Sequence, residues 1–169
     1  MNFRLANLND LDFLKKMYND VIKAMYENNV KIWNEYYPIG VLAEEIEANR
    51  LYVLENDREI IGACTLCDSN EGEAHVKWSE ETKNVFYINM LAINAKYMRQ
   101  GIAGILLEKV KDFAKQKGIN FIRLFVVDSN QPAINLYLKS GYSKVEGVYK
   151  EQITEDFSLT EYGFELEVV

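Results

Sequence analysis

A strand–helix–strand unit between Val85 and Val127 limits most strongly how this chain can fold. The run Val85–Ile93 is apolar and rich in strand-forming residues, and Phe121–Val127 is a second apolar strand. Between them, apolar residues recur at helical spacing: Ile102, Ile105, Leu106, Val110 and Phe113. Two strands joined by a helix pair in parallel through a right-handed crossover. The unit therefore predicts a sheet with helices packed on it.

The remaining elements complete an α+β pattern with a mixed central sheet. Further strands are predicted at Asn2–Ala6, Leu51–Glu55, Ile60–Cys67, His75–Trp78, Tyr142–Tyr149 and Leu159–Val168. Helices are predicted from Asn9, as an N-cap, to Asn28; over Val41–Ala48; from Gly101 to Gly118; and from Pro132 to Gly141. The length of 169 residues predicts one domain, residues 1–169.

The charge balance argues against binding to nucleic acid. The formal net charge is −7, whereas nucleic-acid binding depends on a basic surface. Acidic groups could steer a cationic amine, although a solvated acidic surface is the simpler interpretation. No apolar run is long enough for a signal peptide or a membrane span, so a cytoplasmic protein without membrane contact is expected.

The two cysteines have the spacing of a redox or metal motif, but their position predicts neither. Cys64 and Cys67 fall on a predicted strand, where residues three apart point to opposite faces, roughly 10 Å apart. That separation is too large for a disulfide. No second cysteine pair is present to complete a zinc site, and we expect no bound metal.

The segment Tyr97–Leu107 follows a strand and begins a helix, which is a favourable place for a phosphate group. The first N–H groups of a helix lack partners within the helix and carry the positive end of its dipole. Gly101 and Gly104 would let an anion approach the backbone, and Arg99 adds a positive charge. A P-loop and a three-glycine Rossmann fingerprint are both absent. A coenzyme A pyrophosphate turn and plain helix packing remain as alternatives.

A second motif lies one strand later and favours the coenzyme. The residues Asn130, Ala133, Leu136, Tyr137, Lys139, Gly141 and Tyr142 fit the pattern N-x-x-A-x-x-L-Y-x-K-x-G-[FY]. With the turn pattern [QR]-x-x-G-x-[GA], which falls on Met98, Gly101 and Ala103, the chain resembles the GNAT superfamily of N-acetyltransferases. Met98 departs from that pattern, because Gln or Arg is usual there. The resemblance implies a three-layer fold in which about seven strands are flanked by four helices.

The resemblance also implies an enzyme that transfers an acetyl group from acetyl-CoA to an amine. The backbone of Leu91, Ala92 and Ile93 would bond the pantetheine arm like an added strand. The pyrophosphate would lie on Met98, Arg99, Gln100, Gly101, Ile102, Ala103 and Gly104. Asn130 would contact the coenzyme, and Tyr137 would act at the thioester sulfur as the catalytic proton donor. Packing is the alternative role for Tyr137, which shares one helix face with Ala133, Leu136 and Ser140.

The general base and the amine are not readable from the sequence. Some members of the family have a glutamate where Tyr87 stands, and a tyrosine is a poor base at neutral pH. The other candidate bases are Glu35, Glu73, His75 and Asp128. The substrate site could be lined by Tyr87 and by three further aromatic residues, Trp33, Tyr36 and Tyr37. Packing alone is the alternative role for these three.

A small-molecule amine is the expected substrate. A protein Nα- or lysine-acetyltransferase and a silent acyl-CoA-binding module are the alternatives. The sequence leaves open whether the chain forms a homodimer.

Overall fold

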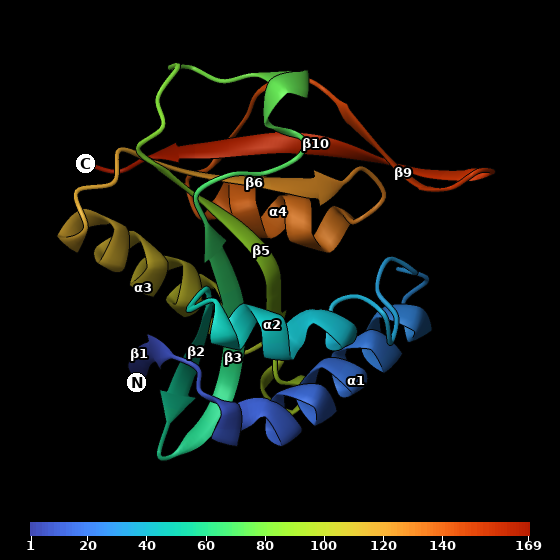
Figure 1. Cartoon of the computed structure of the whole chain (residues 1–169), viewed down its shortest axis with the longest axis vertical. Helices are drawn as coiled ribbons and strands as arrows, with labels where there is room; N and C mark the ends of the chain where they lie inside the picture. Colours follow the sequence, from blue (N-terminus) through green and yellow to red (C-terminus); the bar gives the residue numbers. More distant parts are fainter. The chain divides into compact units, whose positions relative to one another are not determined.

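The computed structural model covers residues 1–169 and contains two compact units. Unit one comprises residues 1–66 and 90–109, and unit two comprises residues 67–89 and 110–169. Strand β5 (Val85–Ile93) and helix α3 (Ile102–Gln116) each contribute residues to both units. Figure 1 labels the elements along the chain.

Unit one is built on antiparallel strands. Strand β1 (Asn2–Leu5) pairs with β2 (Leu51–Asn56), and β2 pairs with β3 (Glu59–Cys67). The β2–β3 turn places Asp57 and Arg58 at positive φ, which is the backbone of a tight hairpin. The helices that lie wholly in this unit are α1 (Leu11–Glu27) and α2 (Leu42–Glu47), with short 3₁₀ turns at Leu8–Asp10, Ile39–Val41 and Ala95–Tyr97.

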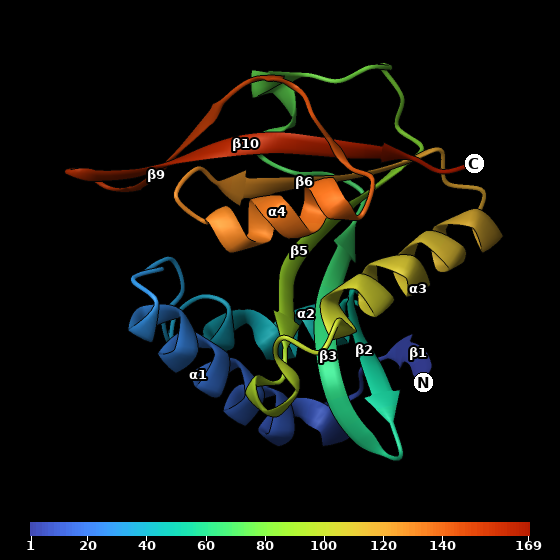
Figure 2. The ribbon, with the colours of Figure 1, turned by 180° about the vertical axis from the view of Figure 1, so that it is seen from behind.

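Helices cover both faces of the unit-one strands. Ala63 is fully buried in a core with Leu14 and Leu42, which come from α1 and α2. A Cβ placed at the neighbouring Gly62 would lie 3.4 Å from a methyl carbon of Leu106 on α3. Neighbouring residues of a strand point to opposite faces, so α3 packs on the face opposite to α1 and α2, as Figures 1 and 2 show. The predicted three layers are confirmed here.

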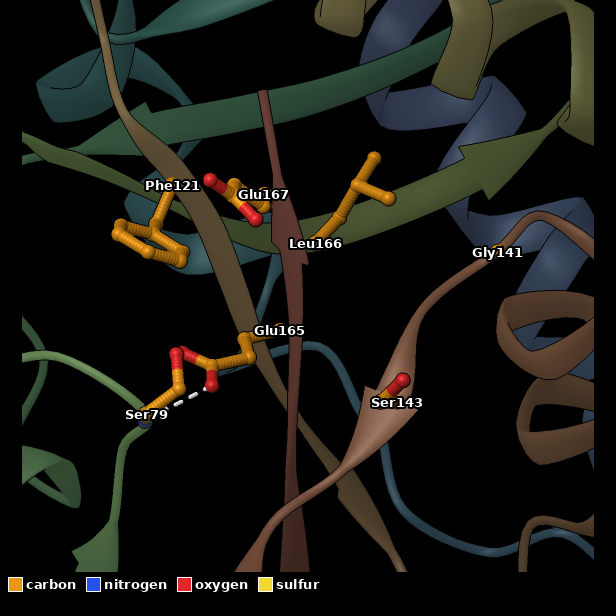
Figure 3. A pocket seen from close by; sticks show the side chains of 7 residues that line it. All are labelled: Ser79, Phe121, Gly141, Ser143, Glu165, Leu166 and Glu167. Carbon is orange, nitrogen blue, oxygen red and sulfur yellow. Dashed lines mark hydrogen bonds between the residues drawn. The ribbon is translucent and has the colours of Figure 1, made fainter. Parts of the chain in front are cut away.

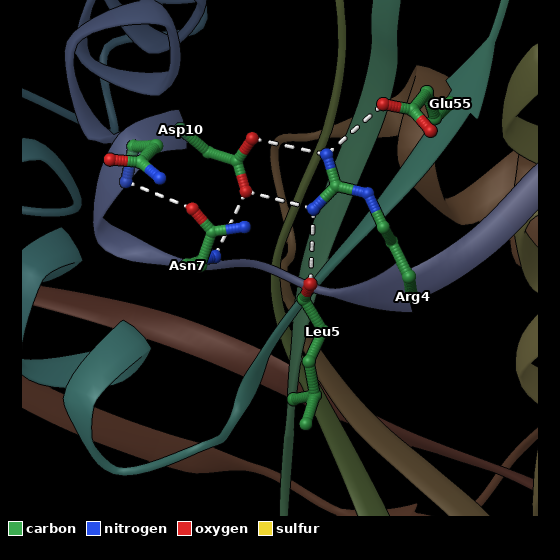
Figure 4. A network of polar contacts seen from close by, with 6 residues as sticks. Arg4, Leu5, Asn7, Asp10 and Glu55 are labelled. Atoms are coloured by element: carbon green, nitrogen blue, oxygen red, sulfur yellow. Dashed lines mark hydrogen bonds and ion pairs between the residues drawn. The ribbon is translucent and has the colours of Figure 1, made fainter. Parts of the chain in front are cut away.

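The N-terminus of α1 is held by a polar network rather than by Asn9. The predicted N-cap at Asn9 is wrong. Asn7 caps the 3₁₀ turn Leu8–Asp10 that leads into α1, and its side chain accepts from the Asn9 N–H at 2.9 Å; Asp10 is the N-cap residue of α1 itself. Arg4 donates to both carboxylate oxygens of Asp10, at 2.8 and 3.0 Å, and to Glu55 at 3.1 Å (Figure 4). Hydrogen bonding to Arg4 lowers the pKa of Asp10, so the network tightens as that carboxyl ionises.

Unit two contains the parallel pair that the sequence predicted. The first half of β5 pairs in parallel with β6 (Phe121–Val127), from Val85 opposite Phe121 to Ile88 opposite Leu124. Strand β10 (Phe157–Glu167) lies antiparallel to β6 and pairs with β7 (Ser143–Lys144) and β9 (Tyr149–Thr154). Helix α4 (Gln131–Lys139) follows β6, and β4 (Val76–Lys77) pairs with β8 (Glu146–Gly147).

The hydrogen-bonded strand order is β1-β2-β3-β5-β6-β10-β7, with β9 added on β10. The sheet is mixed, because the β5–β6 pair is parallel and its other strand pairs given above are antiparallel. The predicted mixed α+β sheet with four α-helices is confirmed, and eight strands take part where about seven were expected.

The largest error of the sequence-based prediction lies near the C-terminus. The single strand predicted over Tyr142–Tyr149 is broken into β7, β8 and the start of β9. Gly147 breaks it: its φ is +101°, and a Cβ there would lie 2.9 Å from the His75 carbonyl oxygen. The β9–β10 hairpin was missed, and β10 begins at Phe157 rather than Leu159.

Both cysteines lie on β3, the strand on which the sequence predicted them. None of the helices combines the length and the apolar character that crossing a membrane requires.

Candidate coenzyme and acetyl-transfer site

The predicted pyrophosphate turn opens α3 with an accessible backbone. Gly101 has φ +78°, and a Cβ added at Gly101 or Gly104 would meet no atom within 4 Å. The Ile105 N–H donates to the Gly101 carbonyl at 3.2 Å, which begins the bonding of the helix. The N–H groups of Ile102, Ala103 and Gly104 precede that bond and have no helical acceptor. Open space and the positive end of the dipole therefore coincide.

The segment before the turn is fastened to β3. Asn94 donates its backbone N–H to the Ile61 carbonyl at 2.9 Å and its side-chain amide to the Ile60 carbonyl at 3.2 Å. The Tyr97 hydroxyl donates to the Glu59 carboxylate, and Lys96 Nζ lies 3.3 Å from that carboxylate. The hydrogen bond from Tyr97 lowers the pKa of Glu59. The turn is thus held by backbone and side-chain bonds on one strand.

Met98 has a structural explanation in this setting. Its side chain packs against the core of unit one, which includes Met17, Leu42 and Ala92. A Gln or Arg at this position would place a polar group toward that core. The following residues, Arg99 and Gln100, are exposed, and Arg99 has φ +61°.

The predicted pantetheine strand lies at the end of β5, in the same unit as the turn. Ala92 is buried in the unit-one core, while Leu91 and Ile93 are half-buried. This alternation is that of a strand with one face on the core. Strand β5 ends at Ile93, directly before the fastened Asn94.

The second motif forms the start and the core-facing side of α4 in unit two. Asn130 is the N-cap, and its side-chain oxygen accepts from the Ala133 N–H at 3.3 Å. Tyr137 is 8% exposed. Its ring centroid lies 5.8 Å from that of Tyr142 and 6.3 Å from that of Phe164. Both proposed roles, packing and catalysis, are compatible with this position.

The four aromatic candidates for the substrate site have different surroundings. Trp33 packs against the unit-one core, with its ring centroid 5.9 Å from that of Tyr18. Tyr36 and Tyr37, in the same unit, are 78% and 44% exposed. Tyr87 lies in unit two, fully covered beside Trp78, and burial raises its pKa. Tyr87 therefore keeps its proton at neutral pH.

The candidate bases are spread over the surface, and an acidic pair was missed. Glu35, His75 and Asp128 are exposed, whereas Glu73 is half-buried with Lys83 Nζ 3.8 Å away. In unit two, burial raises the pKa of Glu161 to about 8, and the charge of Glu151 across the hairpin adds to this effect. The sequence did not reveal this pair, because the β9–β10 hairpin, whose register brings Glu151 and Glu161 close together, was not predicted.

A separate pocket of about 380 Å³ lies in unit two and contains none of the predicted site residues. Ser79, Phe121, Gly141, Ser143, Glu165, Leu166 and Glu167 line it (Figure 3). Glu165 accepts from the Ser79 N–H at 2.8 Å, and its other oxygen lies 3.4 Å from Arg123 Nε. Arg123 also donates to the Glu80 carbonyl at 2.6 Å and stacks on Trp78. This buried pair fastens residues 79–80 to β6 and β10.

Comparison with known proteins agrees with the fold. The sequence profile of the Acetyltransferase (GNAT) family matches residues 14–142. A GNAT-family acetyltransferase from Listeria monocytogenes has a TM-score of 0.76 at 14% identity, over 98% of this chain and 94% of that one. A Salmonella typhimurium protein solved with its cofactor acetyl-CoA has a TM-score of 0.71 at 15% identity, over 100% and 94%. The ribosomal-protein-S18-alanine N-acetyltransferase of Escherichia coli has a TM-score of 0.62 at 16% identity, over 99% and 93%.

The profile match spans more than half of the chain, and the chain therefore belongs to the GNAT acetyltransferase family. It is an enzyme that uses acetyl-CoA as its acetyl donor.

Proposed function

We propose that this enzyme transfers the acetyl group of acetyl-CoA to a primary amine of a small molecule by direct attack. The observation that carries the coenzyme assignment is the accessible start of α3. The first N–H groups of a helix have no acceptor within the helix, and the two glycines have free space above them, so this helix start offers an anion both donors and room. Their chemistry fits the pyrophosphate of coenzyme A.

The remaining coenzyme contacts follow from the two motifs. The backbone of Leu91, Ala92 and Ile93 bonds the pantetheine arm, and the stretch from Met98 to Gly104 binds the pyrophosphate. Asn130 uses its oxygen as a helix cap, which leaves its amide nitrogen as the donor to the coenzyme. In this proposal residues 1–169 act as one catalytic domain of a cytoplasmic protein.

The proton balance of the reaction assigns a role to Tyr137. Acetyl-CoA supplies an activated thioester. The amine nitrogen forms a bond to the acetyl carbon, and the carbon–sulfur bond breaks. The Tyr137 hydroxyl gives its proton to the departing sulfur, and the proton of the attacking amine passes to water or a base. With ordinary pKa values of about 10 for tyrosine and about 8.5 for a thiol, this donation is slightly uphill in water.

The charge of the chain favours a cationic acceptor. Glu71 acts electrostatically on Glu151, and Glu151 acts on Glu161, so three carboxyl groups gather on the hairpin side of unit two. Glu161 keeps its proton at neutral pH, so the ionised carboxyl groups of this cluster are the ones that attract an ammonium ion. The exposed rings of Tyr36 and Tyr37 in unit one are surfaces on which an amine could stack.

A thiol-release assay with acetyl-CoA tests the acceptor. The panel contains small mono- and diamines, peptides with an N-terminal alanine, and lysine peptides with blocked N-termini. We expect turnover with small amines and none with peptides.

The Escherichia coli neighbour makes N-terminal alanine the second candidate acceptor. Turnover with the alanine peptides alone would replace a small-molecule enzyme by a protein Nα-acetyltransferase. If acetyl-CoA stabilises the protein against unfolding but no acceptor on the panel is acetylated, a silent coenzyme-binding module would be favoured.

A further inference from the structure

Strand β5 has an irregular backbone directly before the proposed pantetheine segment. Met90 has φ +55°, in the left-handed region that a residue with a side chain rarely adopts. Met90 is nevertheless 5% exposed and lies within the unit-one core. A kink of this kind turns the peptide groups that follow it, and such irregularities gather next to functional sites. A kink against the backbone's preference needs a bond that holds it.

Tyr18 of α1 supplies that bond. Its hydroxyl donates to the Met90 carbonyl oxygen at 2.6 Å, across 72 positions of the chain. The residue is fully buried, and its ring also contacts Trp33. Burial raises the pKa of Tyr18 well above its ordinary value, so the hydroxyl stays protonated and remains a donor. A buried carbonyl without such a donor would lose the hydrogen bond that water gives it in the unfolded chain.

We propose that Tyr18 is a positioning residue for coenzyme binding, because its bond to the Met90 carbonyl sets the direction in which Leu91–Ile93 present their backbone groups. The inference rests on the assignment of Leu91–Ile93 to the pantetheine arm in the proposed function. Tyr18 itself touches neither substrate in this proposal and acts through the kink.

The test is Tyr18→Phe, which removes one oxygen and keeps the ring. We expect the Kd for coenzyme A, measured by calorimetry, to rise at least about fivefold, the size of one buried hydrogen bond. The KM for acetyl-CoA should rise with it. Val21→Ala is the matched control: Val21 lies in the same helix and the same core, 5% exposed, and is not the donor to Met90. This variant should lose stability without losing coenzyme affinity.

Equal coenzyme affinity in Tyr18→Phe and the parent would overturn the inference and leave Tyr18 as a packing residue. If Tyr18→Phe is too unstable in plain buffer, both variants are compared in sucrose, which strengthens the compact state. Amide exchange at Leu91–Ile93 gives a second measurement: exchange that is as slow as in the parent contradicts a loosened kink. Failure of the parent chain to bind coenzyme A would instead refute the proposed function.

Discussion

The start of α3 and the body of α4 are assigned to the same coenzyme, yet they are built in opposite ways. The turn at residues 98–104 leaves its backbone open at the two glycines, since a Cβ at Gly101 or Gly104 would meet no atom within 4 Å. Residues 130–142 present packed side chains, with the Tyr137 ring beside those of Tyr142 and Phe164. A site made of backbone tolerates many side chains, whereas a site made of side chains specifies each one. This difference explains why the first motif carries Met98 while seven positions of the second fit their pattern.

The largest expected effect is at the turn. Gly101→Glu places a side chain and a negative charge where the pyrophosphate would lie, at φ +78°. We expect coenzyme A affinity to fall at least about 100-fold by calorimetry.

Gly118→Glu is its matched control at the other end of α3. Gly118 has φ +68° and the same open space, so backbone strain and charge change alike. The control should keep its coenzyme affinity; an equal loss in both variants would trace the effect to folding, and no loss in Gly101→Glu would refute the turn assignment.

The second prediction tests the packed motif. Tyr137→Phe removes the proposed proton donor, and kcat should fall about 100-fold with unchanged coenzyme affinity. Tyr142→Phe makes the same one-atom change in the neighbouring ring and should keep kcat. A fall of no more than about twofold in Tyr137→Phe would assign Tyr137 to packing.

The third prediction concerns pH and the hairpin of unit two. The pKa of Glu161 is raised to about 8 by burial and by Glu151, against 4.5 in the unfolded chain. The folded chain keeps this proton over a range in which the unfolded chain loses it. The free energy of unfolding should therefore fall as pH rises from about 4.5 through about 8.

Glu161→Gln should flatten that dependence and stabilise the chain above pH 8. The measurement is the midpoint of urea unfolding at about pH 5, 7 and 9. Glu155→Gln removes the same charge at an exposed residue of the hairpin turn and serves as control. Identical pH profiles for Glu161→Gln and the parent would contradict the shared burial of this pair.

The smallest expected effect is at Met98. Met98→Gln restores a residue usual for the family, yet the turn is proposed to work through its backbone. Coenzyme affinity should change less than about threefold, while stability falls by about 1 kcal/mol because a polar amide enters the core. Met98→Leu should keep both. A tenfold gain in affinity for Met98→Gln would show that a polar side chain does contribute at this position.

The sequence predicted those parts of the fold that repeat a pattern over many residues. The parallel pair of β5 and β6 was identified from their long apolar runs and from the helical spacing between them. The structure contains this pair. Pro132 and Gly141 bracket α4 within one or two residues. Both signals are local and strong.

The parts that were missed depend on contacts between distant residues or on weak patterns. Strand β9 is exposed along most of its length, so it shows no alternation of apolar and polar residues. The break at Gly147 exists because β4 passes against it. In the site, the accessible turn was readable because its chemistry is that of any helix start. The bond from Tyr18 to Met90 was not, since 72 positions separate its partners.

The buried pair of Arg123 and Glu165 constrains how this chain can vary. Their side chains are 3% and 8% exposed. Replacing one of them alone leaves a buried charge without its counterion, which costs about 3–5 kcal/mol, comparable with much of a domain's stability. Replacing both by apolar residues of similar volume can be neutral. Substitutions at these two positions should therefore occur together in relatives, so that the residue at one position predicts the residue at the other.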